Sequence, residues 1–159
     1  MKKGLIEIYT DGSAKGNPGK GGYGIVMRMG KLEKEFSQGY FMTTNNRMEL
    51  LAVIVALEQL KSDRYQIRIY SDSKYVIDAI EKGWVFGWEK KGFKGKKNKD
   101  LWLRYLPLHF KYKPAFTWVK GHDGHPENER CDRLAVEASD MPNLLHDEVY
   151  EELLKNGEN

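Results

Sequence analysis

Two short apolar stretches, each followed by an aspartate, constrain the fold of this chain most strongly. Residues Leu5–Thr10 alternate and are rich in β-branched side chains, which predicts a strand, and Asp11 stands at its expected carboxyl end. Residues Gln66–Tyr70 repeat the pattern, with Asp72 following. A helical pattern separates the two strands, so we expect a crossover that makes them parallel neighbours. Either aspartate taken alone is more often a turn or helix-capping residue.

The rest of the chain completes an α/β pattern. Gly30-Lys31 is a plausible hairpin turn between two further strands, and the glycine-rich residues 16–22 are expected to form a loop before them. That loop lacks the Lys-Ser/Thr of a triphosphate-binding loop and precedes a strand, not a helix. We expect strands at 5–10, 23–29, 32–40, 66–70 and 114–119, and helices from Thr44 or Asn45 to about 61, at 74–80, 100–110, 126–141 and 147–154. The predicted fold is a five-stranded mixed sheet, an antiparallel meander plus parallel strands, flanked by helices.

Length and composition exclude several classes of protein. The chain has 159 residues, which fits one domain spanning 1–159. We expect neither a signal peptide nor a membrane span, because there is no apolar run of suitable length. The single cysteine, Cys131, rules out an internal disulfide and a four-cysteine zinc site. We therefore expect a cytoplasmic monomer with no membrane attachment.

The net charge of +3 conceals two oppositely charged segments. The basic arm, residues 82–99, holds seven lysines and one glutamate, interleaved with four aromatic side chains. Lysines mixed with aromatics are typical of surfaces that bind nucleic acid, although the aromatics could instead anchor the arm to the body. Residues 137–159 hold seven acids and one lysine, so the C-terminal tail, residues 141–159, is expected to be a solvated end.

Four acidic residues lie directly after predicted strands or beside the apolar stripes of predicted helices. Asp11 and Asp72 follow strands, whereas Glu49 and Asp132 lie beside the apolar stripes of two predicted helices. Sites in open α/β sheets form at the carboxyl ends of strands, so the four carboxylates are expected to converge there. They would repel one another unless cations held them, and hard oxygen ligands favour Mg²⁺ or Mn²⁺. Two such ions can bracket a phosphodiester, which predicts metal-dependent phosphodiester hydrolysis.

The chain also resembles a type 1 ribonuclease H of the bacterial kind. The matching segments occur in the family's order over about residues 5–140. They are Thr10–Ser13 with Gly16–Gly19, Thr44–Leu50, Ser71–Ser73 with Tyr75-Val76, Trp118–His122 and His125–Ala135. The resemblance implies a ribonuclease H-like fold and an endonuclease that hydrolyses the RNA strand of RNA–DNA hybrids. Products would carry a 5′ phosphate and a 3′ hydroxyl.

The resemblance implies a catalytic set of four metal-binding carboxylates and one histidine: Asp11, Glu49, Asp72, Asp132 and His122. Two Mg²⁺ ions would bind with substrate, and Mn²⁺ could replace them. Asp11 would contact both ions, Asp132 would help hold the ion that activates water, and Glu49 and Asp72 would help hold the ion at the leaving group. His122 would assist proton transfer or product release. The neighbouring His125 has no such role in the family and is expected to be structural.

The same resemblance implies a set of substrate contacts: Asn17, Thr44, Asn45, Asn46, Lys74, Trp84, Lys90 and Lys91. The asparagines would read 2′-hydroxyl groups, which alone tell RNA from DNA at a given position. Thr44 would help hold a phosphate of the DNA strand, and the three arm residues would grip that strand. Lys74 departs from the pattern, because some members carry a glutamine there that touches the RNA strand. A lysine would exchange a specific hydrogen bond for a phosphate contact.

Two alternatives stay open. The first is a catalytically inactive hybrid-binding module, which the intact set of four acids argues against. The second is another nuclease of the same fold, such as an integrase, a junction resolvase or a proofreading exonuclease. The basic arm and the Asn45-Asn46 pair favour the hybrid nuclease. We expect no separate hybrid-binding domain.

Overall fold

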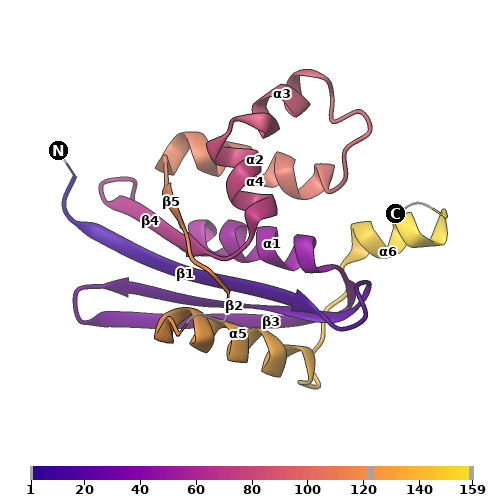
Figure 1. Cartoon of the computed structure of the whole chain (residues 1–159), viewed down its shortest axis with the longest axis horizontal. Coiled ribbons are helices and arrows are strands. Elements are labelled where there is room, and N and C mark those ends of the chain that lie inside the picture. The colour runs from indigo at the N-terminus through magenta and orange to yellow at the C-terminus, as the bar shows by residue number, and fades with distance from the viewer. Residues whose placement is uncertain (1, 122–123, 158–159) are drawn as a thin grey trace.

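The computed structural model describes residues 2–121 and 124–157 and contains one five-stranded sheet in the order β3-β2-β1-β4-β5 (Figure 1). The strands are β1 (Leu5–Ala14), β2 (Gly19–Met29), β3 (Leu32–Thr43), β4 (Gln66–Ser71) and β5 (Ala115–Trp118). The first three form an antiparallel meander, and β4 and β5 extend it in parallel. The predicted mixed sheet, the crossover and the hairpin turn between Met29 and Leu32 are confirmed.

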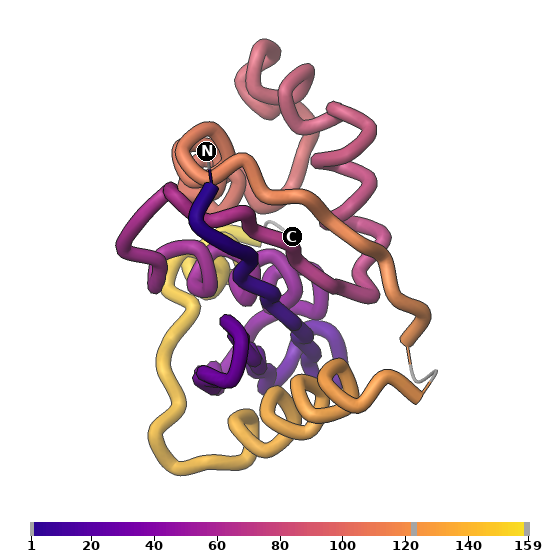
Figure 2. Tube along the Cα trace, turned by 90° about the vertical axis from the view of Figure 1, so that its left-hand side faces the viewer, coloured from indigo at the N-terminus to yellow at the C-terminus, as the bar shows by residue number. Residues whose placement is uncertain are grey.

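Helices cover both faces of this sheet. They are α1 (Asn45–Glu58), α2 (Lys74–Glu81), α3 (Trp84–Lys90), α4 (Lys99–Tyr112), α5 (Pro126–Ser139) and α6 (Glu148–Lys155). Figure 2 looks along the sheet and shows α5 on one side of it and α1, α2 and α4 on the other. Among the described helices, none is long and apolar enough to cross a membrane.

Helix α1 lies between the sheet and α4. More of its residues are therefore buried than the sequence predicts, and it also ends earlier than expected. Met48, Leu51 and Ala52 are buried, as their spacing predicts. The sequence predicts one buried stripe on this helix, formed by Met48, Leu51, Ala52 and Val55. Leu50 and Val53 lie outside this stripe and are fully buried as well, because α4 covers the side of α1 that faces away from the sheet. The helix ends at Glu58, before the expected stop near residue 61.

Strand β1 is longer than its alternation predicts, so Asp11 lies within it and not at its end. Antiparallel pairing with β2 continues to Ala14. The parallel pairing with β4 stops earlier, at Tyr9 opposite Tyr70. Asp11 and Asp72 each lie two residues beyond this last pair, so the two aspartates occupy equivalent positions on neighbouring backbone segments.

The glycine-rich segment was predicted as a loop over residues 16–22, but residues 19–22 already belong to β2. The glycines here permit close packing, not a turn. A Cβ at Gly22 would lie 2.6 Å from the carbonyl oxygen of Ala135 on α5. The loop is therefore confined to residues 15–18.

The basic arm contains α3 and projects from the end of the molecule opposite α5 (Figures 1 and 2). Its aromatic side chains divide between the two roles that the sequence left open. Phe93 is only 4% exposed and joins the hydrophobic core, so it anchors the arm. Phe86 and Trp88 are half-buried against the core, whereas Trp84 is 48% exposed and offers its ring to solvent.

Candidate active site

The approach of β1 to α1 brings the first two acids together. Gly12 follows Asp11, and a Cβ at this glycine would overlap the backbone of Met48 and Glu49. Only glycine allows the strand to lie so close to the first turn of the helix. The close contact places Glu49 beside Asp11, although the two residues are far apart in sequence.

The start of α2 supplies the third acid. Either Asp72 or Ser73 could cap this helix on sequence grounds, and the structure assigns the cap to Ser73, whose Oγ accepts from the Val76 amide at 3.2 Å. The carboxylate of Asp72 is thus not used as a cap. One oxygen from each of Asp11, Glu49 and Asp72 can be chosen so that all three lie within 4.8 Å of one another.

The electrostatics of this cluster favour a bound cation. Burial, followed by the charge of Asp72, raises the pKa of Asp11 to about 7. Burial and the charge of Asp11 raise the pKa of Glu49 well above its ordinary value. Oε1 of Glu49 and Oδ1 of Asp72 are buried and have no hydrogen-bond partner among the described residues. Buried carboxylate oxygens that repel one another and lack donors suit a hard divalent cation.

Asp132 reaches the same place from the other face of the sheet. A Cβ at Gly24 would overlap the carbonyl oxygen of Cys131, so β2 and α5 touch through their backbones. Asp132, next along α5, lines a cleft of about 320 Å³ together with Asp11 and Glu49. It is not part of the group within 4.8 Å, so it borders the three-carboxylate cluster and does not complete it.

Of the two histidines in the β5–α5 loop, His122 lies outside the described residues. His125 is exposed and precedes α5, where the sequence assigned it a structural role. It lines a small cavity together with Asp11, Asp72 and Asp132. The structure therefore places an imidazole beside the acids that is distinct from the one the resemblance singled out.

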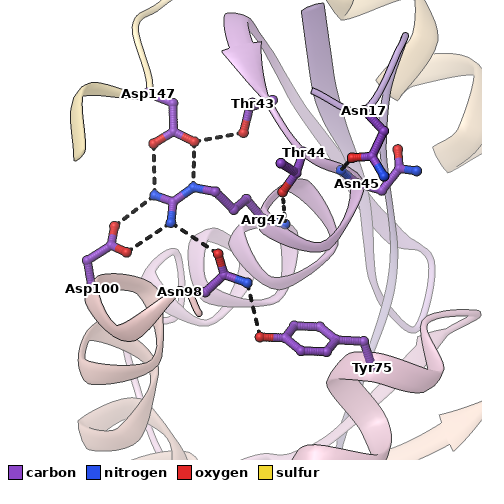
Figure 3. A network of polar contacts seen from close by, with 9 residues as sticks. All are labelled: Asn17, Thr43, Thr44, Asn45, Arg47, Tyr75, Asn98, Asp100 and Asp147. Carbon is purple, nitrogen blue, oxygen red and sulfur yellow. Dashed lines mark hydrogen bonds and ion pairs between the residues drawn. The ribbon is translucent and has the colours of Figure 1, made fainter. Parts of the chain in front are cut away.

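Two of the predicted asparagines, Asn17 and Asn45, form an ordered pair at the start of α1, which we call the asparagine edge (Figure 3). Oδ1 of Asn17 accepts from the Asn45 amide at 2.9 Å, and Oδ1 of Asn45 accepts from the Ala14 amide at 2.6 Å. Their carbonyl ends are therefore fixed, and the amide NH₂ ends remain as oriented donors. Thr44 caps α1 by accepting from the Arg47 amide, and Asn46 lines the cleft with the carboxylates.

Arg47 was not singled out from the sequence, although it lies between Asn46 and Glu49. Its side chain is 2% exposed and forms paired hydrogen bonds with Asp100 and with Asp147 at 2.7–2.9 Å (Figure 3). Asp147 also accepts from the Thr43 hydroxyl, and its side chain is 10% exposed. The expectation that the C-terminal tail is merely a solvated end is wrong at this residue, because the tail provides a counterion for a buried arginine.

Asn98 is the second residue that sequence reasoning missed. It accepts from Arg47 at 3.3 Å and donates to the hydroxyl of Tyr75 at 3.0 Å. It also lines a groove of about 760 Å³ with Asn17 and Thr44. This groove lies beside the cluster of Asp11, Glu49 and Asp72 and not over it, because none of these three residues lines it. The network thus joins the end of the basic arm to the asparagine edge.

The remaining predicted contacts lie on the arm side of the cleft. Lys74 and Trp84 line a groove of about 440 Å³ that also includes Asn46. Lys90 and Lys91 are exposed at the end of α3. The described side chains thus form a path from the carboxylates, past the asparagine edge, to the arm.

Known proteins similar to this chain were found both by sequence and by structure. A family model described as RNase H matches residues 3–140. A ribonuclease H of Rippkaea orientalis is 52% identical over 151 residues, covering 92% of this chain and 92% of that protein. A solved type 1 ribonuclease H with the type 2 active-site motif is 31% identical, with a TM-score of 0.75, over 86% of this chain and 72% of that one. Another, solved in complex with an RNA/DNA hybrid, is 25% identical, with a TM-score of 0.64, over 85% and 96% of the two chains. The chain has the ribonuclease H fold and belongs to the ribonuclease H family of endoribonucleases.

Proposed function

We propose that this chain hydrolyses the RNA strand of RNA–DNA hybrids at the site formed by Asp11, Glu49, Asp72 and Asp132, with two Mg²⁺ ions or with Mn²⁺ in their place. The observation that carries the proposal is the group of three carboxylates within 4.8 Å, two of which keep buried oxygens that have no hydrogen-bond partner within residues 2–121 and 124–157. A protein pays for such an arrangement in stability, so a role with bound cations accounts for it best.

The residues present fit a pair of divalent ions. The three clustered carboxylates would hold them on one side of the cleft, and Asp132 would contribute from α5. When bound, such ions supply a nucleophilic water at neutral pH and stabilise charge on the leaving oxygen. The protein's own part is to fix the four carboxylates on the sheet and on two helices packed against it, so that little reorganisation is needed when substrate arrives.

The asparagine edge supports the choice of a hybrid. Short amide donors can reach 2′-hydroxyls across a shallow minor groove, and these groups are absent from DNA. Asn17 and Asn45 present their NH₂ ends with the carbonyl ends already anchored, and Asn46 lies in the cleft itself. A family relative solved with a bound RNA/DNA hybrid supports the same substrate class.

The basic arm would hold the DNA strand. Phe93 anchors the arm, which leaves the exposed ring of Trp84 and the lysines at the end of α3 available to substrate. Replacing Lys90 and Lys91 with alanine should raise KM, with kcat nearly unchanged. The slope of log KM against log salt concentration should fall by about the amount expected for the loss of two phosphate contacts. An unchanged KM and salt slope would remove these lysines from the binding surface.

The proposal is tested with matched labelled duplexes in Mg²⁺, with EDTA as the control. We expect cutting of the RNA strand of RNA–DNA and no cutting of RNA–RNA or DNA–DNA, with 5′-phosphate and 3′-hydroxyl ends. Hybrid binding without cutting would support the inactive binding module. Cutting of DNA would support another nuclease of the same fold. Asp11→Asn should abolish cutting.

The cytoplasmic location and the monomeric state stay predictions from the sequence.

A further inference from the structure

Two tyrosines form the last matched pair of residues between the parallel strands β1 and β4. Tyr9 lies opposite Tyr70 at the point where this pairing ends. Their ring centres are 4.6 Å apart and the ring planes differ by only 10°, so the two rings stack across the strands. Aromatic pairs in direct cross-strand contact help to hold neighbouring strands together. The Tyr9–Tyr70 stack is therefore the last cross-strand pair before the two aspartates.

The sheet divides into two halves just beyond this stack. Asp11 and Asp72 each follow one of the tyrosines by two residues. At this level β1 stays paired with β2 and β4 stays paired with β5, whereas the pairing of β1 with β4 has ended. Each half of the sheet thus carries one aspartate. The separation of the two carboxylates depends on what holds β1 and β4 together at the preceding pair.

Further contacts hold both rings in place. The hydroxyl of Tyr70 donates to a carboxylate oxygen of Glu7 at 2.8 Å, so the side chain of Tyr70 contacts β1 at two points. The Arg28 guanidinium carbon lies 5.8 Å from the centre of the Tyr9 ring, and the same guanidinium donates to Glu127 near the start of α5 at 3.2 Å. The stack is thus supported from β1, β2 and α5.

Core packing alone does not explain a ring at position 70. Tyr9 is 9% exposed and belongs to the small core between the sheet and α5, whereas Tyr70 is half-buried at its margin. A branched aliphatic side chain would cover the same apolar surface, but it could not stack on Tyr9 or donate to Glu7. The position also bears a load, because clustered carboxylates without a cation repel one another and tend to move the two halves of the sheet apart.

We propose that the Tyr9–Tyr70 stack holds β1 and β4 at the spacing at which Asp11 and Asp72 bind a divalent cation together. This inference rests on the proposed function, and it makes both tyrosines positioning residues. The stack strengthens ion binding because the carboxylates are already close together when the ion arrives. Neither tyrosine is among the described residues that line the cleft or the groove of the basic arm, so binding of the hybrid should not depend on the stack.

A Mg²⁺ titration without substrate tests this proposal directly. The Gly12 amide donates to Oδ1 of Asp11 at 2.8 Å, so its NMR signal in isotope-labelled protein reports on the ion site. Tyr70→Leu removes the ring and should raise the dissociation constant for Mg²⁺ by roughly three- to tenfold, less than the change of about 10- to 100-fold that is typical for residues that hydrogen-bond a metal ligand. Tyr70→Phe keeps the ring and should bind Mg²⁺ with an affinity close to that of wild type.

Tyr40→Leu is the matched control for a general loss of packing. Tyr40 is half-buried, and its ring centre lies 6.4 Å from that of Tyr23. It belongs to β3, which β2 separates from β1. We expect this control to lose stability in urea and to bind Mg²⁺ as the wild type does. An unchanged dissociation constant in Tyr70→Leu, or an equal rise in Tyr40→Leu, would overturn the inference.

The two rings should act as one unit. Tyr9→Leu removes the other half of the stack and should also weaken Mg²⁺ binding. The double variant of Tyr9→Leu with Tyr70→Leu should bind no more weakly than the weaker of the two single variants, because either change alone already abolishes the stack. Additive losses of affinity would show that each ring acts on its own aspartate, which contradicts the proposal.

Cleavage of a labelled hybrid separates this inference from the proposed function. At a Mg²⁺ concentration that half-saturates the wild type, Tyr70→Leu should lower kcat and leave KM for the hybrid unchanged, and excess Mg²⁺ should restore most of kcat. A rise in KM with kcat kept would place Tyr70 in the substrate-binding surface and overturn the positioning role. If the wild type binds Mg²⁺ but cuts no hybrid, the proposed function fails, whereas the titration still decides whether the stack positions the carboxylates.

Discussion

Replacing Asp11 with asparagine should make the metal-free protein more stable while abolishing activity. The pKa of Asp11 moves from 3.8 to about 7 on folding, mainly because of burial and then because of Asp72. Each pKa unit corresponds to about 1.4 kcal/mol, so the ionised side chain costs the folded state roughly 4 kcal/mol at most. The neighbouring Glu49 shares this repulsion, so a gain of roughly 2–4 kcal/mol is expected for the neutral side chain.

The sign of the effect with pH follows from the direction of the shift. The folded-state pKa lies above the unfolded value, so folded Asp11 is still protonated when the unfolded chain has already lost its proton. The protein therefore loses stability as pH rises from about 4 to about 7, and the loss is complete above that range. Asparagine mimics the protonated form. The gain in Asp11→Asn should be largest above pH 7 and nearly absent below pH 4.

Urea unfolding of both proteins in EDTA measures this difference. The midpoint of the variant should be higher above pH 7, with the m-value unchanged. Adding Mg²⁺ should narrow the gap, because the ions bind and stabilise the folded wild-type protein more than the variant. A variant that is less stable than wild type in EDTA above pH 7, or a gap that does not depend on pH, would refute the clustered and repelling site.

Two further predictions concern the framework that holds the site. Asp147→Ala should lower the free energy of unfolding by about 3 kcal/mol, because it deprives the buried Arg47 of one counterion. The matched control is Lys15→Ala, which breaks the ion pair with Asp140, whose two side chains are 53% and 62% exposed. This control should change the free energy of unfolding by less than about 1 kcal/mol. Equal effects of these two variants in urea unfolding would show that the buried network does not stabilise the fold. Gly24→Ala would overlap the backbone of α5, so it should lower the free energy of unfolding by about 1–3 kcal/mol and reduce activity. Gly87→Ala, whose new methyl group meets no atom within 4 Å, should leave stability unchanged or raise it. A Gly24→Ala variant as stable and active as wild type would contradict the close backbone contact.

The local patterns of the sequence were enough to predict the mixed sheet and the meeting of Asp11, Glu49 and Asp72, whereas Asp132, expected to join them, only borders their cluster. Period-two alternation before Asp11 and before Asp72 identified two strands, and the helix between them implied that they are parallel neighbours. The parallel pairing then ends two residues before each aspartate, so the shared sequence position becomes a shared position in space. The Thr44 cap and the spacing of apolar residues were enough to predict α1. The sequence of this helix alone does not show that α4 packs against it.

The parts that could not be predicted depend on contacts between distant segments. The pairing of Arg47 with Asp147 joins residues 100 positions apart, and an arginine in a polar stretch carries no local sign that it will be buried. The length of β1 was missed because glycine and serine usually end a strand, yet Gly12 continues β1 and is needed for contact with α1. The same holds for residues 19–22, where glycines that usually indicate a loop allow α5 to pack against β2.

The most direct measurement of the central claim uses a hybrid with one sulfur in place of a non-bridging oxygen at the cleaved RNA phosphate. The two sulfur diastereomers would be compared in single-turnover cleavage with Mg²⁺ and with Mn²⁺. If divalent ions held by Asp11, Glu49, Asp72 and Asp132 contact that phosphate, one diastereomer should be cut slowly in Mg²⁺ and should recover in Mn²⁺, which accepts sulfur ligands more readily. Equal cutting of both diastereomers in both metals, or cutting that persists in EDTA, would contradict the account.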